Sequence, residues 1–213
     1  MLTLYDYLPS QNAYKVRLLL SHLDLAYRTE MISIFEGEGQ APDYLLKNPT
    51  GAVPVLELED GRVIAESNAI LFYLAEGSQF LPDDRFDRAK VVQWLSFEGD
   101  YIQSTVATLR HWTMTGKLAR QPRALIHMKR AGSLKILSIM DRELATRPFL
   151  AGERYTIADM SAFAYVHRAN EAELPLEDYA HVNAWIERVK AQPGFLEKTY
   201  PYSIDPHSGK DLP

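Results

Sequence analysis

The predicted secondary structure changes character once along the chain, and this change limits the folds that the chain can adopt. Residues 1–77 alternate strand and helix signals in the order β-α-β-α-β-β-α. The first two strands flank a helix, so we expect them to be parallel and joined by a right-handed crossover. Every strong signal after this region is helical, beginning with a long amphipathic stretch over 87–114. We therefore predict an α/β domain at 1–77, a linker at 78–86 and an all-helical domain at 87–213.

The sequence contains no cysteine. It can therefore hold no disulfide framework, no thiolate metal site and no cysteine nucleophile. Six histidines are present, but without HExxH or comparable spacing, so we expect no metal site. Any sulfur nucleophile in a reaction of this protein must arrive with a ligand.

Net charge and hydropathy argue against two classes of partner. A formal net charge of −5 disfavours a general nucleic-acid-binding protein. No run approaches the roughly 18 apolar residues of a membrane span, and the first residues show no basic leader. We expect a cytoplasmic protein that binds neither nucleic acid nor membrane.

One segment carries an excess of positive charge. Residues 101–140 contain no acidic residue but seven basic ones. These are Arg110, Lys117, Arg120, Arg123, Lys129, Arg130 and Lys135. They form either solvated helix faces, neutralised by acidic neighbours, or a local positive field that attracts a small anion.

Two helix N-termini of the first domain carry polar residues. The first is Ser10-Gln11-Asn12, which follows the opening strand and precedes a predicted helix. Unpaired backbone N–H groups and the helix dipole favour anions at such a terminus, and the Ser10 hydroxyl can donate to a ligand thiolate. The alternative is that Ser10 or Asn12 only caps the helix.

The second terminus is Glu66-Ser67, and a proline lies between the two termini in the sequence. Ser67 offers a hydroxyl and a backbone N–H to a carboxylate, while Glu66 can pair with an ammonium. Together they suit an α-amino acid head group, although capping by Ser67 is the simpler alternative.

Pro54 inside a strand pattern indicates an edge, a bulge or a cis bond. A cis bond would turn the Val53 backbone outward, toward an extended peptide ligand, whereas an edge strand would only be protected by the proline.

Two ionisable residues of the helical domain resemble catalytic groups but have simpler explanations. Thr156 and Asp159 have the spacing of a helix capping box, so we assign the Asp159 carboxylate to folding. His111, beside Arg110, could polarise a substrate oxygen. An exposed helical histidine without a catalytic role is the simpler interpretation.

Four segments resemble the cytosolic glutathione transferase superfamily in their residues, order and spacing. They are PSQNAYKVR at 9–17, NPTGAVPVL at 48–56, ESNAI at 66–70 and GERYTIAD at 152–159. The resemblance extends from end to end of the chain. It implies a thioredoxin-like first domain, an all-helical second domain and glutathione as the co-substrate that supplies the missing thiol. It also implies a homodimer whose interface joins the first domain of one chain to the helical domain of the other.

The resemblance assigns roles to individual residues. Ser10 matches the serine that activates the glutathione thiol in theta-like and zeta-like classes, and Asn12 matches an asparagine that faces the thiol in bacterial nu-like enzymes. The residues that match glutathione-binding positions are Gln40, Val53, Pro54, Glu66 and Ser67. Val53, ahead of a cis Pro54, matches the residue whose backbone pairs with the glutathione cysteine. Glu66 and Ser67 match the pair that holds the γ-glutamyl end.

Three functions are compatible with the resemblance. The first is conjugation, in which the glutathione thiolate attacks an electrophilic carbon. The second is glutathione-dependent reduction of disulfides or peroxides, as in nu-like enzymes, because this chemistry needs no protein thiol; the absence of cysteine excludes the mixed-disulfide chemistry of beta-like and omega-like members. The third is a regulatory or assembly role without catalysis, although such proteins tend to lose the Ser10-type hydroxyl or the Glu66-Ser67 pair.

The acceptor substrate itself is not identified by the sequence. We expect its pocket on the long helix of the second domain, where the candidate residues are Tyr101, Thr105, Thr108, His111 and Trp112. The tail at 200–213 has no periodic pattern and either covers the site or lies across the surface.

Overall fold

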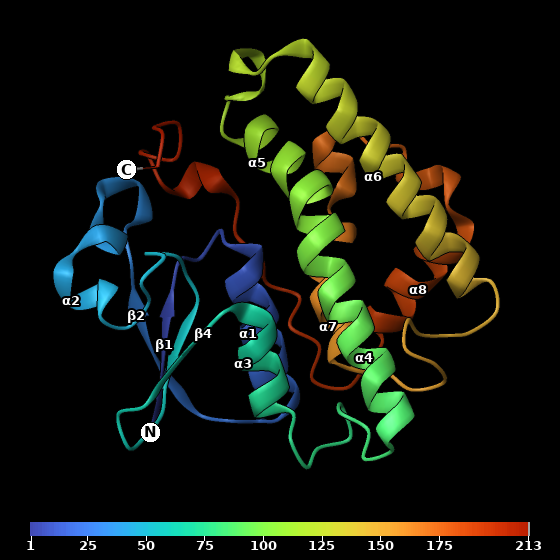
Figure 1. The fold of residues 1–213 in the computed structure, drawn as a ribbon, viewed down its shortest axis with the longest axis horizontal. Coiled ribbons are helices and arrows are strands. Elements are labelled where there is room, and N and C mark those ends of the chain that lie inside the picture. Colours follow the sequence, from blue (N-terminus) through green and yellow to red (C-terminus); the bar gives the residue numbers. More distant parts are fainter. Residues whose placement is uncertain (213) are drawn as a thin grey trace. The chain divides into compact units, whose positions relative to one another are not determined.

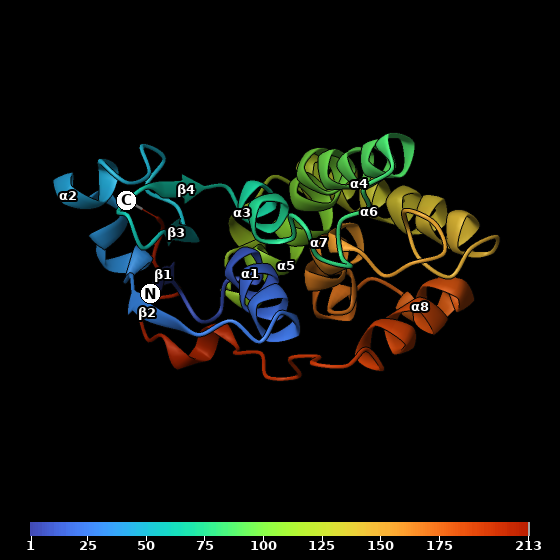
Figure 2. The same cartoon turned by 90° about the horizontal axis from the view of Figure 1, so that it is seen from below.

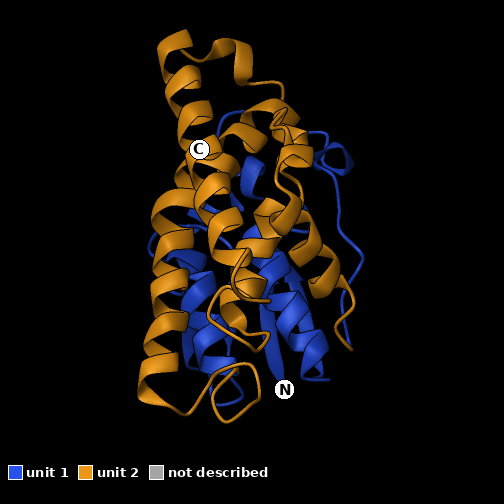
Figure 3. Ribbon diagram, turned by 90° about the vertical axis from the view of Figure 1, so that its right-hand side faces the viewer, with its two compact units in different colours: residues 1–74, 194–213 blue, residues 75–193 orange. Residues whose placement is uncertain are grey.

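The computed structural model describes residues 1–212, and the chain divides into two compact units (Figure 3). Unit 1 contains residues 1–74 and the chain from residue 194 onward, and unit 2 contains residues 75–193. The expected domains at 1–77 and 87–213 differ from this division at the C-terminal end, because the residues from 194 onward group with unit 1.

Unit 1 is built on a four-stranded mixed sheet (Figure 1). Its strands are β1 (Leu2–Asp6), β2 (Tyr27–Met31), β3 (Val55–Glu57) and β4 (Val63–Ala65). The strand order is β2-β1-β3-β4, with β1 and β2 parallel and the other neighbouring pairs antiparallel. This arrangement confirms the predicted thioredoxin-like α/β domain and its parallel first strand pair.

Three helices cover the sheet of unit 1. They are α1 (Gln11–His22), α2 (Pro42–Leu45) and α3 (Ser67–Leu74). α1 and α3 lie together on one face of the sheet and α2 lies on the other (Figure 2). Apolar side chains from β1, β3, α1 and α3 form the core between them, because each element turns its apolar positions inward. The buried members of this core are Leu4, Val16, Leu20, Leu56, Leu58 and Ile70.

The C-terminal tail returns to unit 1 and is held there by hydrogen bonds. The Tyr14 hydroxyl donates to the Leu196 carbonyl at 2.6 Å, and the Ser21 hydroxyl donates to the Gly194 carbonyl at 2.9 Å. The Arg17 guanidinium lies 5.9 Å from the centroid of the Tyr200 ring. These contacts join α1 to residues more than 170 positions away, which explains why local sequence patterns did not assign the tail to the first domain.

Unit 2 is helical throughout its regular structure, as predicted. The helices are α4 (Arg85–Phe97), the π-helical η3 (Glu98–Ala107), α5 (Thr108–Met114), α6 (Arg123–Leu144), α7 (Ile157–Val166) and α8 (Ala180–Lys190). The first three are consecutive and occupy the stretch predicted as one long helix, with the middle ten residues wound more widely. None of the helices in residues 1–212 is long and apolar enough to cross a membrane.

The predicted capping box is present at the start of α7. Thr156 caps the helix, and the buried Asp159 carboxylate accepts the Thr156 backbone N–H at 3.0 Å. The other carboxylate oxygen accepts the Leu150 N–H and the Trp185 indole N–H, both at 2.9 Å. Burial raises the pKa of Asp159 to about 6. The carboxylate therefore joins three segments of unit 2, which agrees with the role in folding assigned from the sequence.

Candidate functional site

Strand register brings four separate segments to one edge of the sheet in unit 1. Val55 at the start of β3 pairs with Tyr5 near the end of β1 and with Ala65 at the end of β4. The residues that follow β1, precede β3 and follow β4 therefore emerge side by side. Because β2 is parallel to β1, the segment after β2 leaves from the same edge. All candidate residues of the first domain lie on these segments.

The loop that carries Ser10 is fixed by α1. The Arg17 guanidinium pairs with the buried Asp6 carboxylate at the end of β1, with N–O distances of 2.8 and 2.6 Å. It also donates to the Leu8 carbonyl at 2.9 Å. Both groups are buried, and paired charge-assisted bonds of this kind hold a backbone in one place. The position of Ser10 is thus set by the end of β1.

Ser10 is the N-cap of α1. Its hydroxyl oxygen accepts the Ala13 backbone N–H at 3.2 Å, and its carbonyl accepts the Tyr14 N–H at 3.0 Å. Capping and thiol activation were alternatives from the sequence, but capping uses only a lone pair of the hydroxyl. The hydroxyl proton remains available to a ligand at the N-terminus of α1, where the helix dipole favours negative charge.

Ser67 is the first residue of α3 and is buried. Its hydroxyl donates to the Asn12 side-chain oxygen at 3.4 Å and accepts from the Lys15 ammonium at 3.3 Å. The structure therefore brings Ser67 and Asn12 together, although they come from different predicted helix termini. Sequence reasoning missed Lys15, which lies three residues after Asn12 and so on the same face of α1.

Glu66 precedes α3 in a left-handed backbone conformation, with φ at +67°. Its carbonyl accepts the Ile70 N–H at 2.9 Å, the first hydrogen bond of the helix, and its side chain is exposed. A residue other than glycine pays a conformational cost there of roughly 1–3 kcal/mol. In spite of this cost the position holds a glutamate, which places an exposed carboxylate next to Ser67.

The loop before β3 is held rigidly. The Val53–Pro54 peptide bond is cis, and the Ala52 carbonyl accepts hydrogen bonds from the Asn48 amide and the Tyr44 hydroxyl, both at 2.8 Å. Pro54 is buried and Val53 is half-buried. The loop is therefore fixed on both sides of the position predicted to face a peptide ligand.

Gln40 reaches this loop from the segment after β2. It ends the 3₁₀ turn η2 (Glu38–Gln40), and its side-chain amide lies so close to Gly51 that a Cβ there would come within 2.4 Å of the Gln40 nitrogen. Gly51 also has a positive φ of 68°, so glycine is required for both reasons. Gln40 thus lies beside the loop that carries Val53.

The acceptor-site candidates all lie on one helical stretch of unit 2. The Thr105 hydroxyl donates to the Tyr101 carbonyl at 2.6 Å, and the Thr108 hydroxyl donates to the Gln103 carbonyl at 2.9 Å. Tyr101 is exposed and Trp112 is half-buried. Both threonine protons are used in hydrogen bonds to the preceding turn, so these hydroxyls can act toward a ligand only as acceptors.

His111 differs from the exposed histidine suggested by the sequence. It is half-buried, and this burial, with smaller effects from Lys117 and Arg110, lowers its pKa to about 4. The imidazole is therefore neutral at neutral pH and donates or accepts hydrogen bonds without a positive charge.

Part of the basic segment at 101–140 is neutralised by other parts of unit 2. The buried Arg110 pairs with Glu171 at 2.6 Å, and Arg130 pairs with Glu173 at 3.0 Å. Both acids lie outside the segment, which favours the first of the two interpretations, neutralised helix faces, for these residues.

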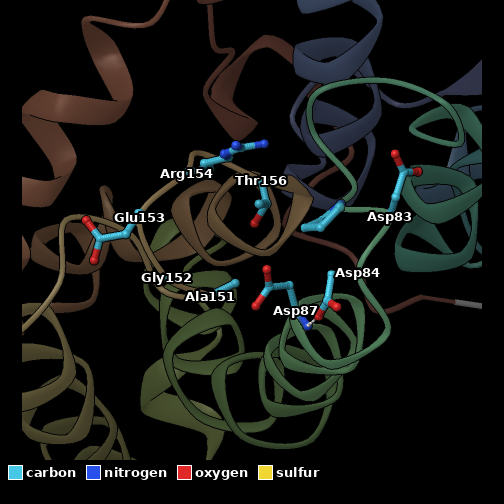
Figure 4. A pocket seen from close by; sticks show the side chains of 9 residues that line it. Asp83, Asp84, Asp87, Ala151, Gly152, Glu153, Arg154 and Thr156 are labelled. Atoms are coloured by element: carbon cyan, nitrogen blue, oxygen red, sulfur yellow. Dashed lines mark hydrogen bonds between the residues drawn. The ribbon is translucent and has the colours of Figure 1, made fainter.

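Unit 2 also contains a cavity of about 600 Å³ lined by none of the predicted site residues (Figure 4). Its acidic side chains come mainly from the start of α4, where the Asp84 carboxylate caps the helix by accepting the Phe86 and Asp87 N–H groups at 2.8 and 3.0 Å. Thr156 belongs to the capping box described above. These polar groups are explained by folding. Within residues 1–212, no three histidine or acidic side chains are grouped so that they could hold a metal ion.

The chain is a two-domain protein. Its thioredoxin-like unit carries a polar site at one edge of the sheet, and its second unit is helical. The family model for the glutathione S-transferase N-terminal domain matches residues 1–76, and the model for the glutathione S-transferase C-terminal domain matches residues 123–188. The chain belongs to the glutathione S-transferase family.

Individual relatives agree with this assignment. The chain is 26% identical to the disulfide-bond oxidoreductase YfcG of Escherichia coli (strain K12), over 91% of this chain and 92% of that protein. The crystal structure of a glutathione S-transferase from Pseudomonas fluorescens Pf-5 has 38% identity and a TM-score of 0.89, covering 92% of this chain and 97% of that one. A glutathione transferase from Burkholderia graminis, with two glutathione molecules bound per subunit, has 26% identity and a TM-score of 0.80, covering 91% and 85%.

Proposed function

We propose that the chain binds glutathione at this edge of unit 1 and catalyses attack of its thiolate on an electrophilic carbon, so that a new C–S bond joins the intact tripeptide to the substrate while the leaving group departs with its bonding electron pair. The observation that carries the proposal is the convergence of Ser10, Asn12 and Ser67 at one sheet edge, beside Glu66 and the rigid Val53–Pro54 loop. The glutathione bound in the similar structure from Burkholderia graminis supports the same ligand here.

In the proposed binding mode, different residues of the chain contact the γ-glutamyl residue and the cysteine residue of glutathione. Glu66 and Ser67 hold the ammonium and carboxylate of the γ-glutamyl residue. The Val53 backbone pairs with the cysteine residue, and Gln40 contacts the same ligand from beside the loop. Each assignment follows the family resemblance, and the sheet register supports it because it places these segments next to one another.

Ser10 is the proposed thiol-activating residue. A serine hydroxyl cannot act as a base at neutral pH, so its role is to donate its proton to the thiolate and stabilise the ionised form. Lowering a thiol pKa by two units requires about 2.7 kcal/mol, which one charge-assisted hydrogen bond and a helix dipole can supply. Asn12 supports this role, but its side-chain oxygen contacts Ser67, so we place it second to Ser10.

A second candidate function is glutathione-dependent disulfide reduction. The thiolate of one glutathione attacks a disulfide that contains a second glutathione; a new S–S bond forms glutathione disulfide, and the other sulfur leaves as a thiolate. The absence of cysteine allows this chemistry, because both sulfurs of the product come from ligands. The name of the Escherichia coli relative and the two bound glutathiones of the Burkholderia graminis structure favour it.

The remaining expectations are part of the proposal. We infer an acceptor site on the helical stretch that carries Tyr101, Thr105, Thr108, His111 and Trp112, and a twofold homodimer. Light scattering at micromolar concentration tests the dimer, since the monomer mass would contradict it.

The decisive experiment is a turnover screen with glutathione against electrophiles, peroxides and mixed disulfides, preceded by calorimetric titration with glutathione. Conjugation of electrophiles supports the first function, and release of glutathione disulfide supports the second. Binding without turnover of any class would favour a non-enzymatic family member, and absence of binding would reject the proposal.

A further inference from the structure

The loop at residues 7–10 carries Ser10 between the end of β1 and the start of α1. One backbone hydrogen bond closes it, from the Ser10 N–H to the Tyr7 carbonyl at 2.8 Å. A hydrogen bond from the Ser10 hydroxyl to a ligand sulfur weakens steeply with distance and angle, and a displacement of about 1 Å in a reacting group costs on the order of a hundredfold in rate. The contacts that hold this loop in place therefore bear on the proposed thiol activation.

Two side chains from the first segment of unit 1 hold the loop. The Arg17 guanidinium donates to the Leu8 carbonyl and pairs with the buried Asp6 carboxylate, as described above. The Tyr7 side chain is buried, and its ring packs against the Phe35 ring with the centroids 5.8 Å apart. The position of the loop is thus set through Arg17 at one point and through Tyr7 at another.

Each of these two side chains has a partner in the C-terminal tail. The Arg17 guanidinium lies 5.9 Å from the centroid of the half-buried Tyr200 ring, and a ring face at this distance attracts a cation. The Tyr7 hydroxyl donates to the Asp205 carboxylate at 2.8 Å, and a hydrogen bond to a charged acceptor is stronger than one between neutral groups. Residues 200 and 205 of the tail thus reach the loop through two different side chains.

The tail is fastened at this place by contacts of its own. The second oxygen of the Asp205 carboxylate accepts the His207 backbone N–H at 2.8 Å. The Nε2 atom of His207 lies 3.1 Å from a carboxylate oxygen of Glu36, in the segment that follows β2. The tail therefore contacts unit 1 at several points over 200–207, as a support for the loop requires.

We propose that Tyr200 and Asp205 are positioning residues for the Ser10 hydroxyl, Tyr200 through Arg17 and Asp205 through Tyr7. This inference rests on the proposed function, because it concerns the hydroxyl proposed to activate the glutathione thiol. In this role the tail neither touches glutathione nor takes a proton. It keeps the Ser10 hydroxyl at the distance from the sulfur that a hydrogen bond needs.

A positioning role and a purely structural role of the tail differ in one measurable quantity. Contacts that only stabilise the fold change the free energy of unfolding and leave the bound thiol unaffected. Contacts that place the Ser10 hydroxyl also change the pKa of bound glutathione, because a hydrogen bond to the thiolate favours the charged form. The pKa of the bound thiol therefore distinguishes the two roles.

The test measures thiolate absorbance of bound glutathione against pH, together with kcat and KM, in variants of the full chain. Tyr200→Leu removes the ring face from Arg17. It raises the pKa of bound glutathione by about half a unit to one unit and lowers kcat at neutral pH roughly three- to tenfold, with KM nearly constant. Tyr200→Phe keeps the ring face and retains the wild-type pKa. Ser21→Ala is the matched control, because it removes the bond to the Gly194 carbonyl that holds the same tail away from the loop, and it also retains the wild-type pKa.

A double substitution shows whether the tail acts through Ser10. In a Ser10→Ala background the positioned hydroxyl is gone, so adding Tyr200→Leu causes no further rise in the pKa of bound glutathione. A further rise as large as that in the wild-type background would mean that the ring acts by another route, and it overturns the proposal. Asp205→Ala, which removes the acceptor of the Tyr7 hydroxyl, replaces Tyr200→Leu if that variant does not fold, with the same expected rise.

The remaining outcomes separate this inference from the proposed function. An unchanged pKa of bound glutathione in a folded Tyr200→Leu overturns the positioning role and leaves glutathione binding and turnover standing. An unchanged pKa in Ser10→Ala rejects Ser10 as the activating residue, and the inference falls with it. A wild-type chain that does not bind glutathione overturns both.

Discussion

The Tyr7 hydroxyl donates to the Asp205 carboxylate at 2.8 Å, so the residue that follows β1 is joined to a residue 198 positions further along the chain. A cavity of about 300 Å³ lies beside this bond, lined by residues 7–9 and 204–207 among others. Burial raises the pKa of Tyr7, which keeps the phenol protonated as the donor. The tail is thereby anchored next to the loop that carries Ser10.

Tyr7→Phe should loosen this anchor. We expect faster hydrogen–deuterium exchange over 200–208 and a decrease of about 1 kcal/mol in the free energy of unfolding, because a hydrogen bond to a charged group is lost. Tyr73→Phe, on an exposed tyrosine of α3, is the matched control. Unchanged exchange in Tyr7→Phe would show that the bond does not hold the tail.

Ser10→Ala should separate thiol activation from binding. We expect the pKa of bound glutathione to rise and turnover at neutral pH to fall roughly ten- to hundredfold, while glutathione affinity stays nearly constant. The free energy of unfolding should decrease by about 1 kcal/mol, because Ser10 caps α1. The measurements are thiolate absorbance and turnover as functions of pH.

Two comparison variants make the Ser10 result specific. Ser10→Thr keeps a hydroxyl and should recover most of the turnover. Asn12→Ala should have the smaller effect. A large loss in Asn12→Ala with unchanged profiles in Ser10→Ala would transfer the role to Asn12 and favour disulfide reduction.

Glu66 offers a pair of substitutions that share an expected effect on binding and differ in their expected effect on stability. Glu66→Gln and Glu66→Gly should both weaken glutathione binding, because each removes the carboxylate proposed to pair with the ligand ammonium. Only Glu66→Gly relieves the left-handed backbone, and it should raise the free energy of unfolding by up to about 1 kcal/mol. Calorimetry and chemical denaturation measure the two effects, and undiminished affinity in both variants would reject the assignment of Glu66.

Asp159 should make stability depend on pH in an unusual direction. Burial raises its pKa from 3.8 to about 6, so the folded state binds the proton more tightly than the unfolded state. Its contribution is then fully present below about pH 4 and is lost as the pH rises through about 6, which amounts to about 3 kcal/mol. Asp159→Asn cannot titrate. Relative to the wild type, the variant should therefore gain about this amount between acidic and neutral pH in denaturation experiments.

The control for Asp159 is Asp87→Asn, on an exposed aspartate in the first turn of α4. It reports the general effect of removing an acidic charge. A wild-type minus Asp159→Asn difference that is flat with pH would mean that the buried carboxylate keeps an ordinary pKa.

His111 should remain neutral across the neutral pH range. Its pKa is lowered to about 4, mainly by burial, so its imidazole C2 proton should titrate near pH 4 in NMR spectra. His111→Gln should leave the shape of the turnover–pH profile unchanged near neutrality. Titration of His111 near pH 6.5 would contradict its burial and would agree with the exposed position suggested by the sequence.

Local sequence patterns predicted the elements of this fold well, because each depends on neighbouring residues. The capping box of Thr156 and Asp159 and the alternation of strands and helices are of this kind. Strand ends were less accurate. The residue pattern predicts one strand over 27–34, but β2 ends at Met31 and a 3₁₀ turn begins at Ile34. The pattern predicts another strand over 53–58, but β3 begins only at Val55, where its pairing with β1 starts.

The candidate site was predictable where a residue followed a turn or capped a helix, as with Ser10 and Ser67. Lys15 was not, because its partner Ser67 lies 52 residues away and its side chain occupies one position of an otherwise helical pattern. The wide turns of η3 were also invisible, since a change in winding leaves the amphipathic pattern nearly intact.

The division of the chain has a consequence for its synthesis. Unit 2 is one continuous segment and is complete when residue 193 has been made, whereas unit 1 needs residues from both ends of the chain. At typical rates of translation, the ribosome needs roughly 6–24 s to pass from the end of the first segment to the tail. During that interval Tyr7 and Tyr14 lack their partners Asp205 and Leu196. The unit that begins first on the ribosome is thus the last to be finished.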